Sequence, residues 1–130
     1  MKKLLTFCAV ILGLTLFAAM RADEQGEFKF EKETQDFGKI PQGKPVSYVF
    51  KFTNVGDQPI ILSEVQPTCG CTVAKFTSTP VKKGEVGEIN ITYNAAAMGP
   101  FSKAITVKSN AKTSVKYIYI KGEVVSENSK

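Results

Sequence analysis

The chain has 130 residues, of which 43% are hydrophobic and 22% are charged. This length fits one ordinary domain, and this composition supports a folded core rather than a disordered chain. The formal net charge is +5, but three positive residues lie in the first 22 positions, and the remainder carries 14 basic and 12 acidic residues. So small and scattered an excess argues against nucleic acid or an anionic membrane surface as a partner. The sequence has no His, which excludes Ser-His-Asp and Cys-His catalysis and imidazole-based metal sites.

The first 22 residues have the pattern of a secretory signal peptide. Lys2 and Lys3 give a basic start, and residues 4–20 form an apolar run with only two polar members. The run is short for a membrane span, which needs roughly 20 apolar residues. We therefore expect a signal peptide over residues 1–22 and an exported domain over residues 23–130 that is periplasmic, secreted or on the cell surface, without a stable membrane span. An uncleaved N-terminal anchor is the alternative.

Short alternating apolar runs, separated by Gly, Pro, Asn and Asp, follow the leader and predict β-strands rather than helices. A leading strand is expected near residues 28–31 or 34–37. The later expected strands are, in chain order, residues 46–52, 59–62, 88–93, 101–107 and 115–124. The side chains expected to face the core are Val46, Tyr48, Phe50, Phe52, Ile89, Ile91, Tyr93, Phe101, Ile105, Val107, Ile118 and Ile120. The pattern predicts an all-β fold, an immunoglobulin-like antiparallel β-sandwich of about seven strands.

The most unusual feature of the sequence is Cys69-Gly70-Cys71, in the loop after Val65. Cysteines of exported proteins tend to be oxidised, which makes a Cys69–Cys71 disulfide one expectation. The bond requires Cα atoms within about 6.8 Å, so the chain must turn at Gly70. Because so short a loop removes little entropy from the unfolded chain, a labile, redox-active disulfide is a better interpretation than a structural staple.

Three other interpretations of the cysteine pair stay open. The pair is a candidate soft-metal site for Cu(I), with Met98 as a third ligand, because alternate loops of a sandwich emerge at the same end. Tetrahedral zinc would lack ligands here. The cysteines are also candidates for an intermolecular disulfide to a partner protein. In the simplest interpretation, Cys69 and Cys71 only pack the end of the sandwich.

Five segments together carry a family resemblance: Phe50–Ile60 (FKFTNVGDQPI), Thr68–Thr72 (TCGCT), Gly84–Gly87 (GEVG), Gly99–Phe101 (GPF) and Ser109–Ala111 (SNA). In this order they resemble exported bacterial domains of the family of unknown function numbered 1573. The fold of that family is similar to the Hydin and major-sperm-protein group of immunoglobulin-like sandwiches. The resemblance runs from about Phe37 to Val124. It implies this fold and an extracytoplasmic location, and it implies no activity.

The function expected from the sequence is that of a noncatalytic exported module that binds or supports a protein partner. No catalytic residue and no cofactor are expected. A sandwich offers exposed strand edges to which a partner can add a strand. A pilus-type chaperone is a special case, but such chaperones resemble domains that clamp a carboxylate with a basic pair including Arg, and the only arginine here is Arg21 in the leader. The alternative function is redox or soft-metal chemistry at Cys69 and Cys71.

Overall fold

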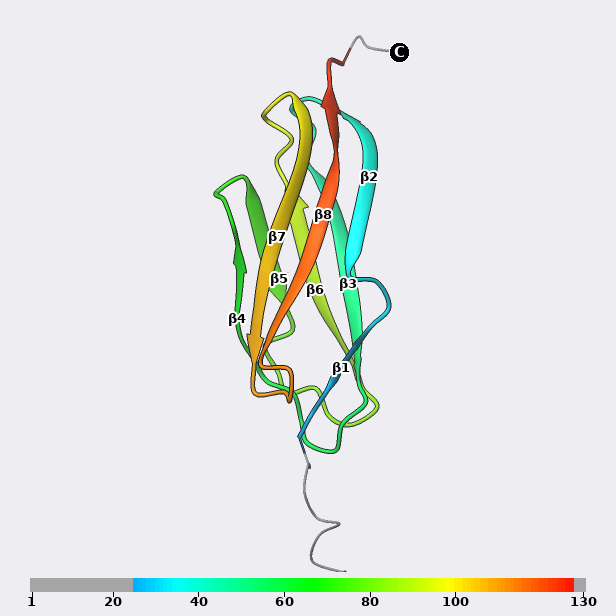
Figure 1. The fold of residues 1–130 in the computed structure, drawn as a ribbon, viewed down its shortest axis with the longest axis vertical. Coiled ribbons are helices and arrows are strands. Elements are labelled where there is room, and N and C mark those ends of the chain that lie inside the picture. The colour runs from blue at the N-terminus through cyan, green and yellow to red at the C-terminus, as the bar shows by residue number, and fades with distance from the viewer. Residues whose placement is uncertain (1–24, 128–130) are drawn as a thin grey trace, which may run out of the picture.

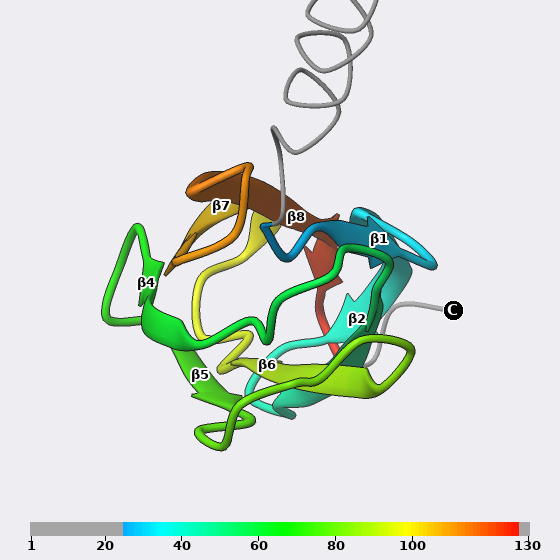
Figure 2. The ribbon, with the colours of Figure 1, turned by 90° about the horizontal axis from the view of Figure 1, so that it is seen from below.

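Two four-stranded sheets pack face to face in the computed structural model, which describes residues 25–127 (Figures 1 and 2). The strands are β1 (Phe28–Phe30), β2 (Thr34–Pro41), β3 (Val46–Asn54), β4 (Leu62–Pro67), β5 (Thr72–Phe76), β6 (Val86–Tyr93), β7 (Gly99–Ser109) and β8 (Val115–Val125). The first sheet has the order β1-β3-β6-β5 and the second the order β2-β8-β7-β4. All neighbouring strands are antiparallel except β2 and β8, which are parallel. The expected signal peptide lies outside the described residues.

The predicted immunoglobulin-like sandwich is confirmed, except that β2 and β8 pair in parallel rather than antiparallel, and its strands differ from the prediction in three ways. Both segments offered as a leading strand are strands, because the chain crosses from one sheet to the other between β1 and β2. The expected strand at residues 59–62 is wrong, since Ile60 makes only an isolated bridge to Val81 before β4 begins. Strand β5 was not expected. Its first two positions invert the usual pattern, because Thr72 is buried while Val73 is 56% exposed.

The core lies between the two sheets and contains the side chains predicted to face inward. Phe50, Phe52, Ile89 and Ile91 of the first sheet are fully buried. The second sheet contributes Ile105, Val107, Ile118 and Ile120, also fully buried, together with Phe101 and Val124. Tyr48 and Val46 lie at the rim of this cluster and are partly buried. The alternation of strand side chains therefore accounts for the sandwich without any disulfide between its sheets.

Strand β1 is held to the first sheet by an aromatic cluster built on Phe52. The ring of Phe52 lies 4.9 Å from that of Phe28 and 5.5 Å from that of Phe30, between centroids. Gly87 is the register partner of Phe52 on β6, and a Cβ at this glycine would overlap the Phe52 ring. The absence of a side chain at Gly87 therefore leaves room for the Phe52 ring. No helix within residues 25–127 is long and apolar enough to cross a membrane.

Candidate functional site

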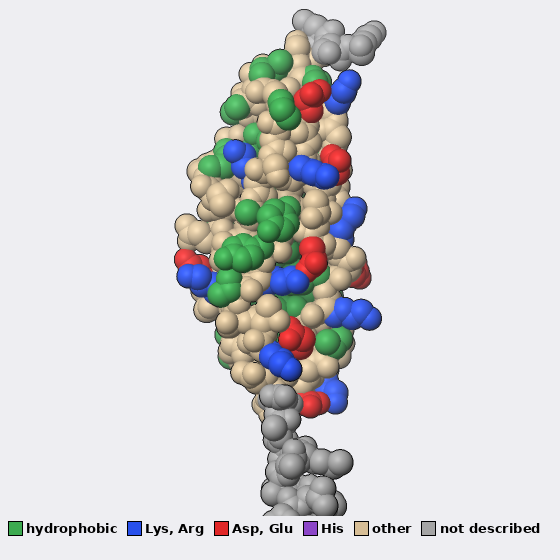
Figure 3. Space-filling model, viewed as in Figure 1, with side chains coloured by type: hydrophobic (Ala, Val, Ile, Leu, Met, Phe, Trp, Pro, Cys, Tyr) green, Lys and Arg blue, Asp and Glu red, His purple; other side chains and the backbone are tan. Residues whose placement is uncertain are grey.

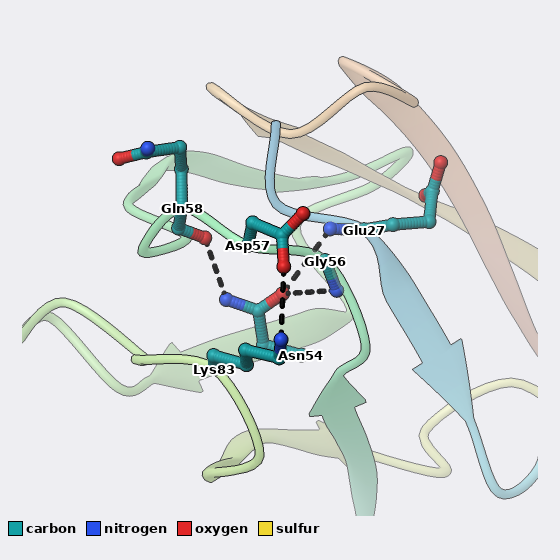
Figure 4. A network of polar contacts seen from close by, with 6 residues as sticks. All are labelled: Glu27, Asn54, Gly56, Asp57, Gln58 and Lys83. Atoms are coloured by element: carbon teal, nitrogen blue, oxygen red, sulfur yellow. Dashed lines mark hydrogen bonds and ion pairs between the residues drawn. The ribbon is translucent and has the colours of Figure 1, made fainter. Parts of the chain in front are cut away.

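The buried Asn54 side chain links three backbone segments by hydrogen bonds, and Figure 4 draws those to Glu27, Gly56 and Gln58. Its Oδ1 accepts hydrogen bonds from the backbone N–H groups of Glu27, at 3.2 Å, and Gly56, at 2.9 Å. Its Nδ2 donates to the carbonyl oxygens of Gln58, at 2.7 Å, and Val81, at 2.9 Å. All four capacities of the amide are thus used within the fold. Asn54 is structural, and nothing of it remains for a ligand.

Other residues of the segments that carried the family resemblance also serve the fold. Asn110 accepts a hydrogen bond from the N–H of Ile61, at 2.7 Å, and donates to the carbonyl of Pro59, at 3.1 Å. Gly84 and Gly99 have φ angles of 81° and 106°, which favour glycine. Four of the five segments are therefore explained by packing, turns and hydrogen bonds. Only the segment containing the cysteines is left.

The cysteine loop connects β4 of the second sheet to β5 of the first, and the structure joins Cys69 and Cys71 by a disulfide. Their Cα atoms are 5.3 Å apart. The backbone turns as the spacing requires, since the N–H of Thr72 donates to the carbonyl of Cys69 at 3.4 Å. A side chain at Gly70 would meet no atom within 4 Å, so the tip of the turn is open. Both cysteines are half-buried.

The hydroxyl of Thr72 lies beside both sulfurs. Its Oγ1 is 3.8 Å from Sγ of Cys69 and 3.6 Å from Sγ of Cys71. The residue is only 5% exposed, although it is polar. No role was predicted for Thr72 beyond its place in the TCGCT segment. The signal available was a threonine directly after the second cysteine, at a buried strand position.

The proposed third metal ligand, Met98, lies in the loop between β6 and β7 and is 54% exposed. This loop does share an end of the sandwich with the cysteine loop, because the N–H of Asn94 donates to the carbonyl of Cys71 at 2.9 Å. Sulfurs that are bonded to each other are not thiolate ligands, so a soft metal would require reduction first. Residues 25–127 contain no group of three or more His, Cys, Asp or Glu that could hold a metal ion. Cu(I) binding by Cys69, Cys71 and Met98 therefore stays a prediction for the reduced protein.

A second candidate site is the outer side of the second sheet. The side chains of β8 alternate between core and solvent, which leaves Tyr117 51% and Tyr119 40% exposed. On β7, Thr106 lies beside Tyr117 and Ala104 beside Tyr119. Val115, 42% exposed, extends the apolar surface along β8. These five residues are called the tyrosine face, and Figure 3 shows hydrophobic side chains gathered in the middle of this side of the molecule.

An open depression of about 400 Å³ borders the tyrosine face where β2 bulges away from β8. Its lining includes Asp36 and Lys39 from β2 and Lys121 and Glu123 from β8. Lys121 lies two residues beyond Tyr119 on the same strand. The depression therefore continues the tyrosine face and adds two positive and two negative side chains to its border. Neither feature was predicted, because the alternating pattern of residues 115–124 indicates only which side chains face the core.

Several charged side chains of the described surface form ion pairs. Lys44 and Glu127 are 2.8 Å apart and 63% and 64% exposed. A hydrogen bond from Lys44, together with its charge, lowers the pKa of the Glu127 carboxyl. Lys83 and Asp57 form a similar pair at 2.9 Å. Such pairs contribute little to stability, and neither is placed in a cleft where a perturbed pKa would suggest catalysis.

The comparisons with known proteins agree on the fold. The model of the family described as "Protein of unknown function (DUF1573)" matches residues 28–124. No curated protein matches the chain. Among solved structures, a protein of unknown function from Porphyromonas gingivalis W83 is 20% identical with a TM-score of 0.69, over 83% of this chain and 51% of that one. The chain thus spans about half the length of that protein.

Two further structures show how widely this fold occurs. PapD-like domain 7 of human CEP192 is 11% identical with a TM-score of 0.65, over 84% of this chain and 92% of that one. The YadV chaperone is 11% identical with a TM-score of 0.56, over 79% of this chain and 54% of that one. At these identities the likeness extends to the fold alone.

Proposed function

The chain belongs to the DUF1573 family of proteins of unknown function, and we propose that it is an exported, noncatalytic module that binds a protein partner through its tyrosine face. The observation that carries the proposal is the pair of tyrosines, Tyr117 and Tyr119, each about half exposed in the middle of a sheet face. Tyrosine is enriched in protein interfaces because its ring offers a large, rigid contact area with a polar end. Exposed apolar side chains gathered on one sheet face support the assignment of an interaction surface.

The charges around the tyrosine face suit a protein better than a polyanion. Lys108 and Glu64 form an ion pair of 3.5 Å at one border. Lys121 and Glu123 balance each other at the other border, in the open depression. Polyanions are bound by an excess of positive charge, whereas protein interfaces have a polar rim of both signs around an apolar centre.

Strand addition, which the sequence also suggested, is less well supported than binding on the face. The outer strands of the sheets are β1, β5, β2 and β4. β1 has three residues and β5 has five, with Lys75 in the exposed row. β2 and β4 each contain a register shift, and β4 ends at Pro67. Short edge strands, bulges, and Lys or Pro residues on an edge are the usual features that prevent another strand from pairing with a sheet.

Export is part of the proposal and is supported by the signal-peptide pattern of residues 1–22, with residues 23–130 as the exported domain. The fold supports protein binding, since a chaperone is among the proteins that share it. The absence of His from the sequence supports a noncatalytic role.

Site-specific photo-crosslinking in the producing cells tests the proposal. A photoreactive phenylalanine analogue replaces Tyr119 in the full chain, and the control places it at Val86, which is 54% exposed at the start of β6 in the first sheet. We expect one protein adduct from position 119 and none from position 86. Added unmodified protein should compete the adduct away, whereas a folded Tyr117→Ser/Tyr119→Ser variant should not.

Two outcomes would contradict the proposal. Equal adducts from both positions would show nonspecific contact, and competition by the double tyrosine variant would remove the tyrosine face from the interface. An adduct with twice the mass of the chain would identify the partner as a second copy, which sedimentation of the purified protein would then show as a dimer.

A further inference from the structure

The cysteine loop has features that a structural role does not explain. Its disulfide joins residues only two apart, so it restricts the unfolded chain very little. Gly70 has open space around it and no positive φ angle, so the turn does not demand glycine for its conformation. Cys69 and Cys71 are each half-buried, so neither residue is sealed inside the core.

The Thr72 hydroxyl is the second observation. It is buried, and within the described residues the two sulfurs are its only hydrogen-bond partners. A sulfur in a disulfide is a weak acceptor, so this contact compensates poorly for burying a hydroxyl. A thiolate is a charged acceptor, and hydrogen bonds to charged groups are about twice as strong as neutral ones. The hydroxyl is therefore better matched to the reduced pair than to the disulfide.

We propose that Cys69, Cys71 and Thr72 form a thiol–disulfide exchange site, in which the Thr72 hydroxyl donates a hydrogen bond to the sulfur that leaves. A thiolate of an external thiol attacks one sulfur, a mixed disulfide forms, and the Cys69–Cys71 bond breaks to release the other sulfur as a thiolate. A second external thiol then attacks the mixed disulfide. One protein disulfide and two thiols become one protein dithiol and one external disulfide. Because Oγ1 lies within 3.8 Å of both sulfurs, it serves whichever one leaves.

Within residues 25–127, the hydrogen bonds at the loop come from uncharged groups, namely the Thr72 hydroxyl, the Thr72 backbone N–H and the N–H of Asn94. The titratable side chain opposite Thr72 is Tyr93, its register partner on β6, which is 3% exposed. Tyr93 is present in the wild type and in each Thr72 variant, so the comparison between them isolates the effect of the hydroxyl on the sulfurs.

The test measures the reduction equilibrium of the full-length protein in glutathione buffers, by acid quenching and mass spectrometry of alkylated thiols. At pH 9, half-reduction of Thr72→Val should require a reduced-to-oxidised glutathione ratio about fivefold to tenfold higher than half-reduction of the wild type. The reason is that valine cannot donate a hydrogen bond to the thiolate. At pH 6 the difference should fall below about twofold, since a free thiol has a pKa of about 8.5 and is then protonated. Thr72→Ser keeps a hydroxyl and should match the wild type at both pH values.

Three results would overturn the proposal. The first is a folded Thr72→Val variant whose equilibrium equals that of the wild type at pH 9. The second is a difference of the same size at both pH values, which would indicate lost packing rather than a lost hydrogen bond. The third is a protein whose equilibrium equals that of a free Thr-Cys-Gly-Cys-Thr peptide, because the fold would then contribute nothing.

The source of the external thiol is distinguished by a rate measurement. Exchange is followed with glutathione and with a reduced cysteine-containing peptide at equal thiolate concentration. Faster exchange with the peptide supports a protein thiol as the co-reactant, and equal or slower exchange supports a small thiol. If neither glutathione nor the peptide exchanges with the protein disulfide within hours, the exchange proposal is also overturned.

Discussion

Replacing Asn54 by Ala should destabilise the domain by about 3–5 kcal/mol, although the residue belongs to neither candidate site. The substitution removes four hydrogen bonds to the backbone, of which Figure 4 draws those to Glu27, Gly56 and Gln58. The Val81 carbonyl keeps a partner, because it also accepts from the N–H of Ile60 at 2.8 Å. The N–H groups of Glu27 and Gly56 lose their acceptor. An ordinary hydrogen bond contributes about 1 kcal/mol, and a buried group left unpaired costs about 1–3 kcal/mol, so the sum reaches the stated range.

Urea unfolding followed by circular dichroism measures this loss as a shift of the midpoint at constant slope. The matched control is Asn94→Ala, which removes one exposed hydrogen bond, from the N–H of Ala96 to Oδ1 at 3.1 Å. That change should cost about 0.5–1 kcal/mol. Equal losses from the two substitutions would refute the reasoning, because the buried network would then contribute no more than a surface turn.

Three further outcomes are expected. Phe50→Ala should cost about 3–5 kcal/mol because it empties a fully buried aromatic site, whereas Val49→Ala, on the other side of β3, should cost clearly less in the same urea assay. Gly87→Ala should lower stability by about 1–3 kcal/mol through overlap with the ring beneath it, and Gly70→Ala, in open space, should leave stability unchanged. N-terminal sequencing of extracytoplasmic protein should begin at or near Asp23, and an intact N-terminal methionine in that pool would favour a membrane anchor instead.

Much of the fold could be predicted from the sequence because strand alternation is a local signal. Runs such as Ile89, Ile91 and Tyr93 have buried side chains at every second position, and the structure places them in the core. The failures have the same cause. Thr72 is polar yet buried, and Val73 is apolar yet exposed, so a pattern that equates apolar with inward cannot find β5. Crossing from one sheet to the other is set by tertiary packing and leaves no local periodicity.

The candidate sites were harder to predict because each depends on neighbours distant in the sequence. Cysteine spacing alone placed the two sulfurs together, but the role of the Thr72 hydroxyl follows from its burial and its distances to the sulfurs. The tyrosine face requires the register between β7 and β8, which sets Ala104 beside Tyr119 and Thr106 beside Tyr117. Neither register nor burial of a polar side chain can be derived from one strand considered by itself.

The two candidate sites occupy different parts of the sandwich, so their functions should be separable. The tyrosine face covers the outer side of β7 and β8 in the second sheet, whereas the cysteine loop joins the sheets at the end that also holds Asn94. No hydrogen bond or ion pair in the described residues links Thr72 to Tyr117 or Tyr119. Substitutions at residues that share no interaction partner usually have independent effects. Thr72→Val should therefore leave crosslinking at position 119 unchanged, and the double tyrosine variant should leave the reduction equilibrium unchanged. A change in both assays from either variant would mean that partner binding and thiol exchange use one surface.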